Sequence, residues 1–282
     1  MTKPPTQPIQ ADLADRVAMM DWIGRTKRNF RMQYRLAVHT LIPWLERHKA
    51  LPMNAAVCEI GCGEGGVLLA FAERGTSYAL GTDIMGLLLE QVSAPIAEQL
   101  GLTVEYAGHD VINDEIPEPW QERFDVVLMR DVIEHLDDAG AALRNIARIM
   151  KPGGVILITF PPYTSAYGGH QQLLGTTMGN LPFVHMLPHV WFNKIVAKGD
   201  PMNTEEVRRL HEIRCSAKGI ERAAANAGFE NVDERFFGLR PVFRWKYDRK
   251  IPTLELTRVK GMPFVRALAM EAAYIFRKPS AA

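Results

Sequence analysis

Four glycines lie within six positions of the stretch EIGCGEGG, between a short apolar run and a segment with helical spacing. Gly61, Gly63 and Gly66 fit the pattern G-x-G-x-x-G, which lets a ligand approach the backbone of a strand-to-helix loop closely. Asp83 comes 20 residues after Gly63, at the end of the next apolar run. A carboxylate at that place can accept hydrogen bonds from both hydroxyls of a ribose. The pattern therefore predicts a site for an adenosine-containing ligand.

Glu59 helps to distinguish the two ligand classes that meet this requirement. A nicotinamide dinucleotide places its pyrophosphate against the loop and the helix N-terminus. The carboxylate of Glu59, two residues before Gly61, would repel that pyrophosphate. S-adenosylmethionine (SAM) carries a sulfonium, an ammonium group and one carboxylate, but no phosphate. We therefore expect SAM as the cofactor with Glu59 among its binding residues, and NAD is the alternative.

Two histidines follow apolar runs at positions where a second substrate would enter. His135 lies in RDVIEHL, and His170 comes ten residues after the run GVILITF, in PPYTSAYGGHQQ. Histidine can remove a proton from a weakly acidic hydroxyl at neutral pH. We predict that His170 and His135 are catalytic, with a structural role as the alternative for each. The residues predicted to contact the substrate are Tyr163, Tyr167, Gln171 and Arg240.

The elements that would position these residues alternate between strand and helix. Apolar runs at AAVCEIG, SYALGTDI, LTVEYAGHD, RFDVVLMRD and GVILITF are separated by helical segments, which predicts an α/β fold with a doubly wound, mostly parallel sheet. The predicted domain organisation is a disordered tail (1–11), N-terminal helices (12–50), a ligand-binding core (51–160), an inserted lid (161–213) and a completion of the sheet (214–282) that includes a second substrate-side loop (238–268).

A family resemblance follows from the order of the motifs EIGCGEGG, GTDI, AGHD, FDVVLMRDVIEHL and KPGGVILITF. Together they resemble the class I SAM-dependent methyltransferases, nearest to the small-molecule O-methyltransferases. The resemblance implies a Rossmann-like, seven-stranded sheet with helices on both faces and an antiparallel last strand. It also implies roles for individual positions: Gly61 and Gly63 beside the methionine part of SAM, Asp83 on the ribose, Ile84, Asp110 and Val111 at the adenine, and the backbone carbonyl of Arg130 at the amino group.

A metal site is an alternative suggested by the same stretch. The spacing of Asp131, Glu134 and His135 resembles the ubiquinone-pathway O-methyltransferases, in which an acidic pair and a histidine hold magnesium. A Glu-His pair at this place is also common in methyltransferases that bind no metal. We predict no metal and keep these three residues as the alternative ligand set.

Charge and composition narrow the class of partner. The 282 residues carry 33 Lys and Arg and 32 Asp and Glu, so the near-neutral chain is not expected to bind nucleic acid. Residues 1–160 have 15 basic and 21 acidic side chains, whereas residues 161–282 have 18 and 11. A basic second part would favour an anionic substrate. The apolar stretch 181–199 could cover a hydrophobic or lipid-linked acceptor, or the lid could pack around its own core.

The sequence thus predicts a SAM-dependent methyltransferase that acts on a small-molecule or lipid-linked acceptor, at a hydroxyl oxygen. N- or C-methylation, an NAD-dependent oxidoreductase, a non-catalytic scaffold and an RNA methyltransferase are the alternatives. No apolar run reaches the roughly 20 residues of a membrane span. The three cysteines form no disulfide framework, so we expect a cytoplasmic protein with reduced thiols. The sequence predicts no oligomeric state.

Overall fold

The computed structural model describes residues 12–247, 251–256, 266 and 268–280. The predicted disordered tail and part of the predicted loop 238–268 lie outside the described residues.

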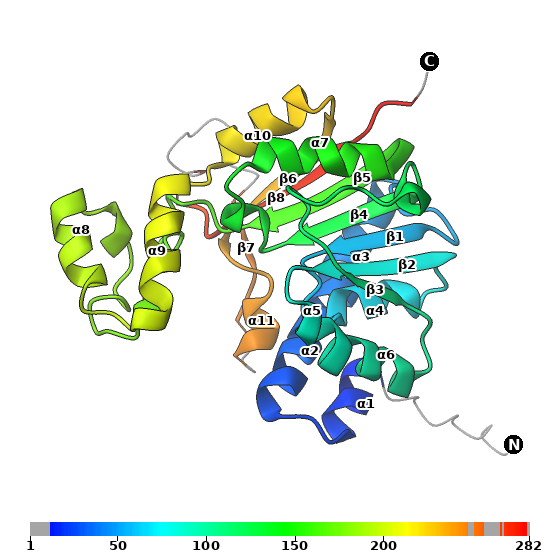
Figure 1. The fold of residues 1–282 in the computed structure, drawn as a ribbon, viewed down its shortest axis with the longest axis horizontal. Helices are drawn as coiled ribbons and strands as arrows, with labels where there is room; N and C mark the ends of the chain where they lie inside the picture. The colour runs from blue at the N-terminus through cyan, green and yellow to red at the C-terminus, as the bar shows by residue number, and fades with distance from the viewer. Residues whose placement is uncertain (1–11, 248–250, 257–265, 267, 281–282) are drawn as a thin grey trace, which may run out of the picture.

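A mixed sheet of eight strands forms the centre of the described chain, in the order β3-β2-β1-β4-β5-β8-β6-β7 (Figure 1). Strands β1 to β5 pair in parallel, and β8 lies antiparallel between β5 and β6. This arrangement confirms the predicted Rossmann-like fold with its antiparallel last strand, and the two-residue β7 is added at the edge. The strands are β1 (Ala56–Ile60), β2 (Tyr78–Asp83), β3 (Glu105–Gly108), β4 (Phe124–Arg130), β5 (Met150–Phe160), β6 (Glu230–Leu239), β7 (Leu254–Glu255) and β8 (Glu271–Arg277).

Helices cover both faces of the sheet because its central strands are apolar on both sides. Alternate residues of β4 enter different cores: Val126 and Leu128 face one layer of helices, and Val127 and Met129 face the other. The first layer contains α1 (Leu13–Met19), α2 (Gly24–Leu36), α3 (Ile42–Arg47), α4 (Gly66–Ala72) and α6 (Ala94–Leu100), and the second contains α7 (Ala139–Ile149) and α10 (Ala217–Asn226). Short helical turns complete the body: Ala37–Leu41, α5 (Gly86–Leu88), Leu89–Ser93, η3 (Glu118–Trp120), η4 (Ile133–His135) and α11 (Phe243–Lys246).

The segment predicted as a lid, residues 161–213, stands to one side of the sheet (Figure 1). Its elements are η5 (Gln171–Leu174), η6 (Val184–Met186), α8 (His189–Val196) and α9 (Pro201–Ile213). Leu174, Val184, Phe192, Val196 and Val207 form a small separate core. The lid is therefore held together by its own apolar contacts. None of the described helices has the length and apolar character needed to cross a membrane.

Candidate active site

The glycine loop joins β1 to α4 at the carboxyl edge of the sheet. Gly61 and Gly63 adopt left-handed backbone angles, with φ of 67° and 51°. A Cβ on Gly61 would lie 2.3 Å from Cγ2 of Val132, so no larger residue fits there. A Cβ on Gly63 would meet one atom of the described residues, Nε2 of Gln33, at an ordinary contact distance of 3.6 Å, so this residue is less crowded than Gly61. The loop is thus shaped for the close approach of a ligand.

Asp83 ends the neighbouring strand β2 and faces the loop. Its Oδ2 accepts a hydrogen bond from the Gly63 N–H at 3.1 Å, and its Oδ1 accepts one from the Met85 N–H at 2.9 Å. Each oxygen keeps a lone pair for a ribose hydroxyl. Beside it, Ile84 and Met85 are 78% and 60% exposed and offer an apolar surface. A carboxylate next to open apolar surface fits the ribose and adenine of SAM.

Asp110 and Val111 follow β3 at the same edge of the sheet. The Asp110 carboxylate accepts hydrogen bonds from Asn113 Nδ2 at 2.9 Å and from the Ile112 N–H at 2.8 Å. These bonds, the Asn113 side chain foremost, hold the pKa of Asp110 below its ordinary value. Val111 is buried. The turn therefore keeps an ionised acceptor group where the family resemblance expects an adenine contact.

Glu59 lies beneath the loop rather than on its surface. It is only 3% exposed, and its Oε2 accepts a hydrogen bond at 2.9 Å from the Leu68 N–H in the first turn of α4. Burial raises the pKa of Glu59 to about 8. In this position the side chain connects strand β1 to helix α4 and so holds the two ends of the loop.

Helix α2 supports the glycine loop from outside. Glu64, within the loop, accepts hydrogen bonds from Asn29 Nδ2 at 2.7 Å and from Gln33 Nε2 at 3.0 Å. Gln33 Oε1 in turn accepts one from the Gly66 N–H at 3.0 Å. Asn29 and Gln33 lie 35 and 31 positions before Glu64 and belong to no motif, so no pattern in the sequence indicated this support.

A chain of buried and partly buried charges begins at the end of β4. The Asp131 carboxylate accepts hydrogen bonds from Arg130 Nη1 and Arg240 Nη2, and Arg240 Nε donates to Glu271 Oε2 at 2.6 Å. Burial alone would raise the pKa of Asp131, but the Arg240 and Arg130 guanidinium groups hold it below its usual value. Asp131 is thus an ionised carboxylate that is already shared between two arginines.

His135 is oriented by a residue of the lid. Its Nδ1 lies 2.7 Å from Oε1 of Glu206 on helix α9, and Arg209 donates to both oxygens of that carboxylate at 2.9 and 3.0 Å. Arg209 Nη1 also donates to the backbone carbonyl of His135 at 2.8 Å. Nε2 of His135 is left for other partners and lies 3.9 Å from Glu134 Oε1.

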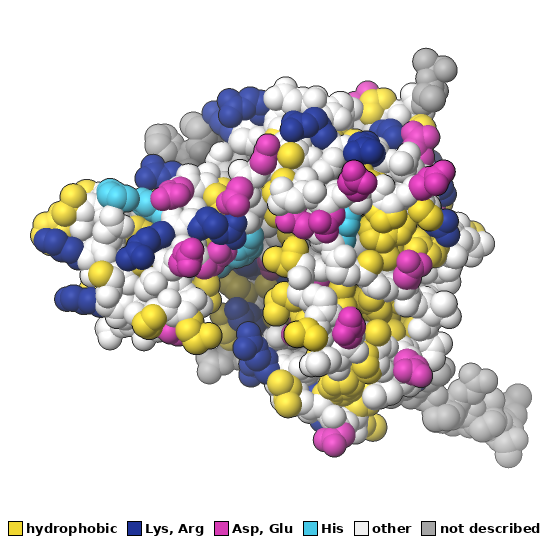
Figure 2. Space-filling model, in the orientation of Figure 1, with side chains coloured by type: hydrophobic (Ala, Val, Ile, Leu, Met, Phe, Trp, Pro, Cys, Tyr) yellow, Lys and Arg dark blue, Asp and Glu magenta, His cyan; other side chains and the backbone are white. Residues whose placement is uncertain are grey.

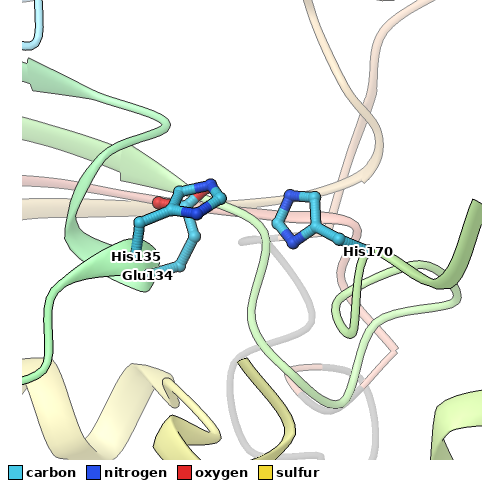
Figure 3. Close-up of side chains that lie close together, drawn as sticks. All are labelled: Glu134, His135 and His170. Carbon is cyan, nitrogen blue, oxygen red and sulfur yellow. The ribbon is translucent and has the colours of Figure 1, made fainter. Parts of the chain in front are cut away.

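His170 approaches His135 from the other side of the opening (Figure 3), and their ring centroids are 4.9 Å apart. Its backbone is left-handed, with φ of 50°, which is uncommon for a residue other than glycine. Nδ1 of His170 is buried without a hydrogen-bond partner among the described residues. Burial lowers the pKa of His170 to about 4, so its imidazole is neutral at neutral pH.

Glu134 completes this group and is only 2% exposed. In the part of the chain that the structure describes, neither of its carboxyl oxygens has a hydrogen-bond partner. Burial first, and then the charge of Asp131, raise the pKa of Glu134 well above its ordinary value. Burying a carboxyl group without a hydrogen-bond partner costs free energy, and buried polar groups in proteins normally have such a partner.

A cavity of about 290 Å³ opens beside His170, between the lid and the body. Ser165, Tyr167 and His170 line it from the lid, and Arg240, Phe243 and Lys246 line it from the body. Lys and Arg side chains gather along this hollow in Figure 2. Arg240 is neutralised by Asp131 and Glu271, whereas Lys246 has no carboxylate partner within the described residues. Desolvation, followed by the charge of Arg240, lowers the pKa of Lys246.

The predicted substrate contacts divide into two groups. Tyr167 and Arg240 reach the cavity. Tyr163 and Gln171 lie inside the lid: the Tyr163 hydroxyl donates to the His185 carbonyl at 3.0 Å, and Gln171 Nε2 donates to the Ala166 carbonyl at 2.9 Å. The structure thus brings the first pair to the cavity with His170 and leaves the second pair as supports of the lid.

Comparison with known proteins identifies the family of the chain. The family model described as a methyltransferase domain matches residues 28–234, well over half of the chain. The chain belongs to the methyltransferase domain family. Its fold is that of a SAM-dependent methyltransferase from Mesorhizobium loti, with a TM-score of 0.51 and 16% identity over 83% of this chain and 96% of the other. The predicted class I SAM-dependent methyltransferase and its cofactor SAM are thereby confirmed.

Two curated relatives show how far the similarity extends. A ubiquinone biosynthesis O-methyltransferase of Pseudomonas fluorescens (strain SBW25) is 27% identical over 122 residues, which are 42% of this chain and 49% of that protein. Phosphoethanolamine N-methyltransferase 1 of Triticum aestivum is 36% identical over 111 residues, which are 39% of this chain and 21% of that protein. The matches span half or less of these relatives, and the relatives methylate both oxygen and nitrogen.

Two residues near His135 and the cavity, Glu206 and Lys246, lie outside the methyltransferase motifs. Glu206 lies in a lid helix with an ordinary polar sequence, and its adjacent Glu205 is exposed. Lys246 belongs to the stretch 239–250, which is rich in basic and aromatic residues. This composition is the sequence feature that could have indicated Lys246 as a substrate contact. Their place at the site depends on how the lid and α11 pack against the body.

Proposed function

We propose that this methyltransferase moves the methyl group of SAM to a hydroxyl of a small, anionic acceptor that binds in the cavity beside His170. The observation that supports a hydroxyl acceptor is the contact between His135 and Glu206. A carboxylate on Nδ1 keeps the proton on that nitrogen and leaves Nε2 as the base. A hydroxyl acceptor needs such a base, since it is a weak nucleophile while it keeps its proton.

The chain's own residues would hold and deprotonate the acceptor. SAM, when bound, supplies a methyl group on a positively charged sulfur. Nε2 of His135 takes the hydroxyl proton as the new C–O bond forms and the C–S bond breaks, so that S-adenosylhomocysteine and a methyl ether are the products. The lid excludes water from the reacting groups and keeps the acceptor in line with the methyl group.

Lys246 supports the anionic character of the acceptor. Among the described residues no carboxylate forms a salt bridge with this cation, since the nearby Asp131 is paired with Arg240, and a negative group on the acceptor would supply such a partner. The name of the wheat relative points the same way, because phosphoethanolamine carries a phosphate. That name also makes an amine the second candidate for the methylated group.

A lipid-linked acceptor is a further candidate. The lid exposes large apolar side chains, with Val190 and Trp191 more than 60% exposed. The Pseudomonas relative is named for ubiquinone biosynthesis, and this name is compatible with such an acceptor. The cytoplasmic location stays a prediction that rests on three free cysteines, Cys58, Cys62 and Cys215.

The test has two stages that use the full chain. Calorimetric titration with S-adenosylhomocysteine should show binding, and titration with NADH should show none. The protein is then incubated with methyl-labelled SAM and a matched panel of hydroxyl and amine acceptors, each with and without a carboxylate or phosphate. We expect methyl ethers of the anionic hydroxyl compounds. Methylamines as the products would overturn the hydroxyl assignment, and a preference for uncharged acceptors would overturn the anionic one.

A further inference from the structure

Three side chains lie close together where the turn η4 meets the lid, and one of them, His170, also lines the cavity. Glu134, His135 and His170 each offer a donor atom, and these atoms all lie within 4.8 Å of one another. Glu134 and His135 come from the turn η4 after β4, and His170 comes from the lid, so the group bridges the two parts of the molecule. Figure 3 shows the two imidazole rings facing each other with the carboxyl group of Glu134 beside them.

Glu134 is the carboxyl group of this cluster and has no hydrogen-bond partner among the described residues. Its side chain is almost completely buried, and neither oxygen receives a hydrogen bond from any described residue. A buried carboxyl group in that situation indicates a partner that protein atoms do not supply. A cation between the carboxyl group and the two imidazoles would be such a partner.

His135 has the arrangement of a metal-binding histidine. Ligand imidazoles commonly donate their second ring N–H to a carboxylate, which fixes both the tautomer and the ring orientation. Glu206 accepts from Nδ1 of His135 at 2.7 Å, and Arg209 holds that carboxylate in place. Nε2 is consequently directed toward Glu134 and His170.

His170 adds a second free imidazole nitrogen. Its Nδ1 is buried and has no hydrogen-bond partner in the described part of the chain. The residue is held at a positive φ, which costs backbone energy and tends to occur at functional sites. Asp131, by contrast, is bound by Arg130 and Arg240 and cannot turn to a cation without breaking both contacts.

We propose that Glu134, His135 and His170 form a binding site for a divalent transition-metal ion such as Zn²⁺. Two imidazoles and one carboxylate, with one position open, are a common ligand set for such ions, whereas Mg²⁺ prefers oxygen ligands. Donor atoms around a tetrahedral ion lie about 3.3–3.6 Å apart. The present spacing of up to 4.8 Å needs a closure of about 1 Å, which a shift of the lid loop at His170 can provide.

The ion would change how the acceptor is activated, and this part rests on the proposed function. Nε2 of His135 cannot both bind the ion and take the proton. When bound, the ion would lower the pKa of an acceptor hydroxyl that took its open position. The ligand set also differs from the alternative of Asp131, Glu134 and His135, because the lid supplies one ligand.

Metal binding is tested on the full chain without SAM or acceptor. The protein is stripped with a chelator and titrated with Co²⁺, followed by its visible absorption and by calorimetry, and then with Zn²⁺ in competition. We expect one ion per chain. Glu134→Gln, His135→Ala and His170→Ala should each weaken binding by at least about tenfold, and Glu206→Gln by about 10- to 100-fold. His189→Ala, on lid helix α8 and outside the cluster, is the matched control and should bind normally.

Two results would overturn the proposal: no Co²⁺ or Zn²⁺ bound by the wild-type protein at micromolar concentration, or equal affinity in the wild type and the three ligand variants. Displacement of Co²⁺ by millimolar Mg²⁺ would contradict the choice of a transition metal. Far-ultraviolet circular dichroism identifies any variant that fails to fold. If a histidine variant does not fold, Glu134→Gln still tests the site, because glutamine has nearly the same shape as glutamate. Binding of S-adenosylhomocysteine to the stripped protein is measured in parallel, so the metal site and the proposed function can fail separately.

Discussion

At the scale of single residues, the site depends on carboxyl groups that the fold places in different surroundings. Asp83 keeps free lone pairs at an open edge, Asp131 is shared between two arginines, and Glu59 is buried beneath a helix. The same functional group therefore neutralises charge at Asp131 and supports a loop at Glu59, and we expect it to bind the cofactor at Asp83. Burial and hydrogen bonding decide which role each one has.

Asp83→Ala should weaken the binding of S-adenosylhomocysteine by at least about tenfold, because a hydrogen bond to a charged group contributes about 1.5–3 kcal/mol. Calorimetric titration gives the affinity. Glu90→Ala, at an exposed position shortly after β2, is the control that removes a carboxylate elsewhere. Unchanged affinity in Asp83→Ala would remove Asp83 from the cofactor site.

Glu59 should make the stability of the ligand-free protein depend on pH. The folded chain raises the pKa of Glu59 from 4.5 to about 8, so between these values the folded state retains a proton that the unfolded state has lost. The free energy of unfolding then falls as pH rises through this window. Glu59→Gln has no such proton and can still accept from Leu68. Between pH 5 and pH 9 it should gain at least about 1 kcal/mol relative to the wild type, measured by urea unfolding. Parallel pH profiles would contradict the raised pKa.

At the scale of elements, the lid contributes to the site through helix α9. Asp200 caps this helix by accepting from the Met202 N–H at 3.1 Å, and Pro201 occupies its first turn. Glu206 and Arg209, one turn apart on α9, then reach η4 and hold His135. The helix thus connects the lid to the turn after β4 and orients one of its histidines.

Glu206→Gln should lower kcat by about tenfold or more while the affinity for S-adenosylhomocysteine stays unchanged, since a general base contributes about 10²- to 10⁴-fold and Glu206 orients it. Steady-state kinetics on the acceptor found in the panel separates kcat from KM. Glu205→Gln, the adjacent exposed position on the same helix, is the matched control. Equal kcat values for the two variants would mean that Glu206 only supports the lid.

At the scale of the whole molecule, part of the positive charge of residues 161–282 lies at the cavity, which Arg240 and Lys246 line. The hollow between the lid and the body contains Lys and Arg side chains (Figure 2), whereas the carboxylates Asp131 and Glu271 nearby are already paired with Arg240. The cavity consequently presents Lys246 as its cation in the described chain. An uneven charge along the sequence becomes a binding preference only because the fold gathers it there.

Lys246→Gln should raise KM for anionic acceptors by about tenfold or more and leave KM for their uncharged analogues unchanged, because a charge-assisted hydrogen bond is lost. Added salt should reduce the difference between the two classes in the wild type. Lys194→Gln, an exposed lid lysine that does not line the cavity, is the control. An equal rise in KM for both classes would indicate a change in cavity shape rather than in charge.

The sequence by itself determined the parts of this protein whose pattern is local. Strand, glycine loop and helix follow one another between residues 56 and 72, and Asp83 ends the next strand, so periodicity and spacing were enough to predict the fold and to indicate the edge of the sheet at which we expect SAM. Only the tertiary structure decided the acceptor side. His135 and Glu206 are separated by 71 positions, and His170 and Lys246 come from two further segments. Their meeting depends on how the lid and α11 pack on the sheet, which no short-range pattern of residue types encodes.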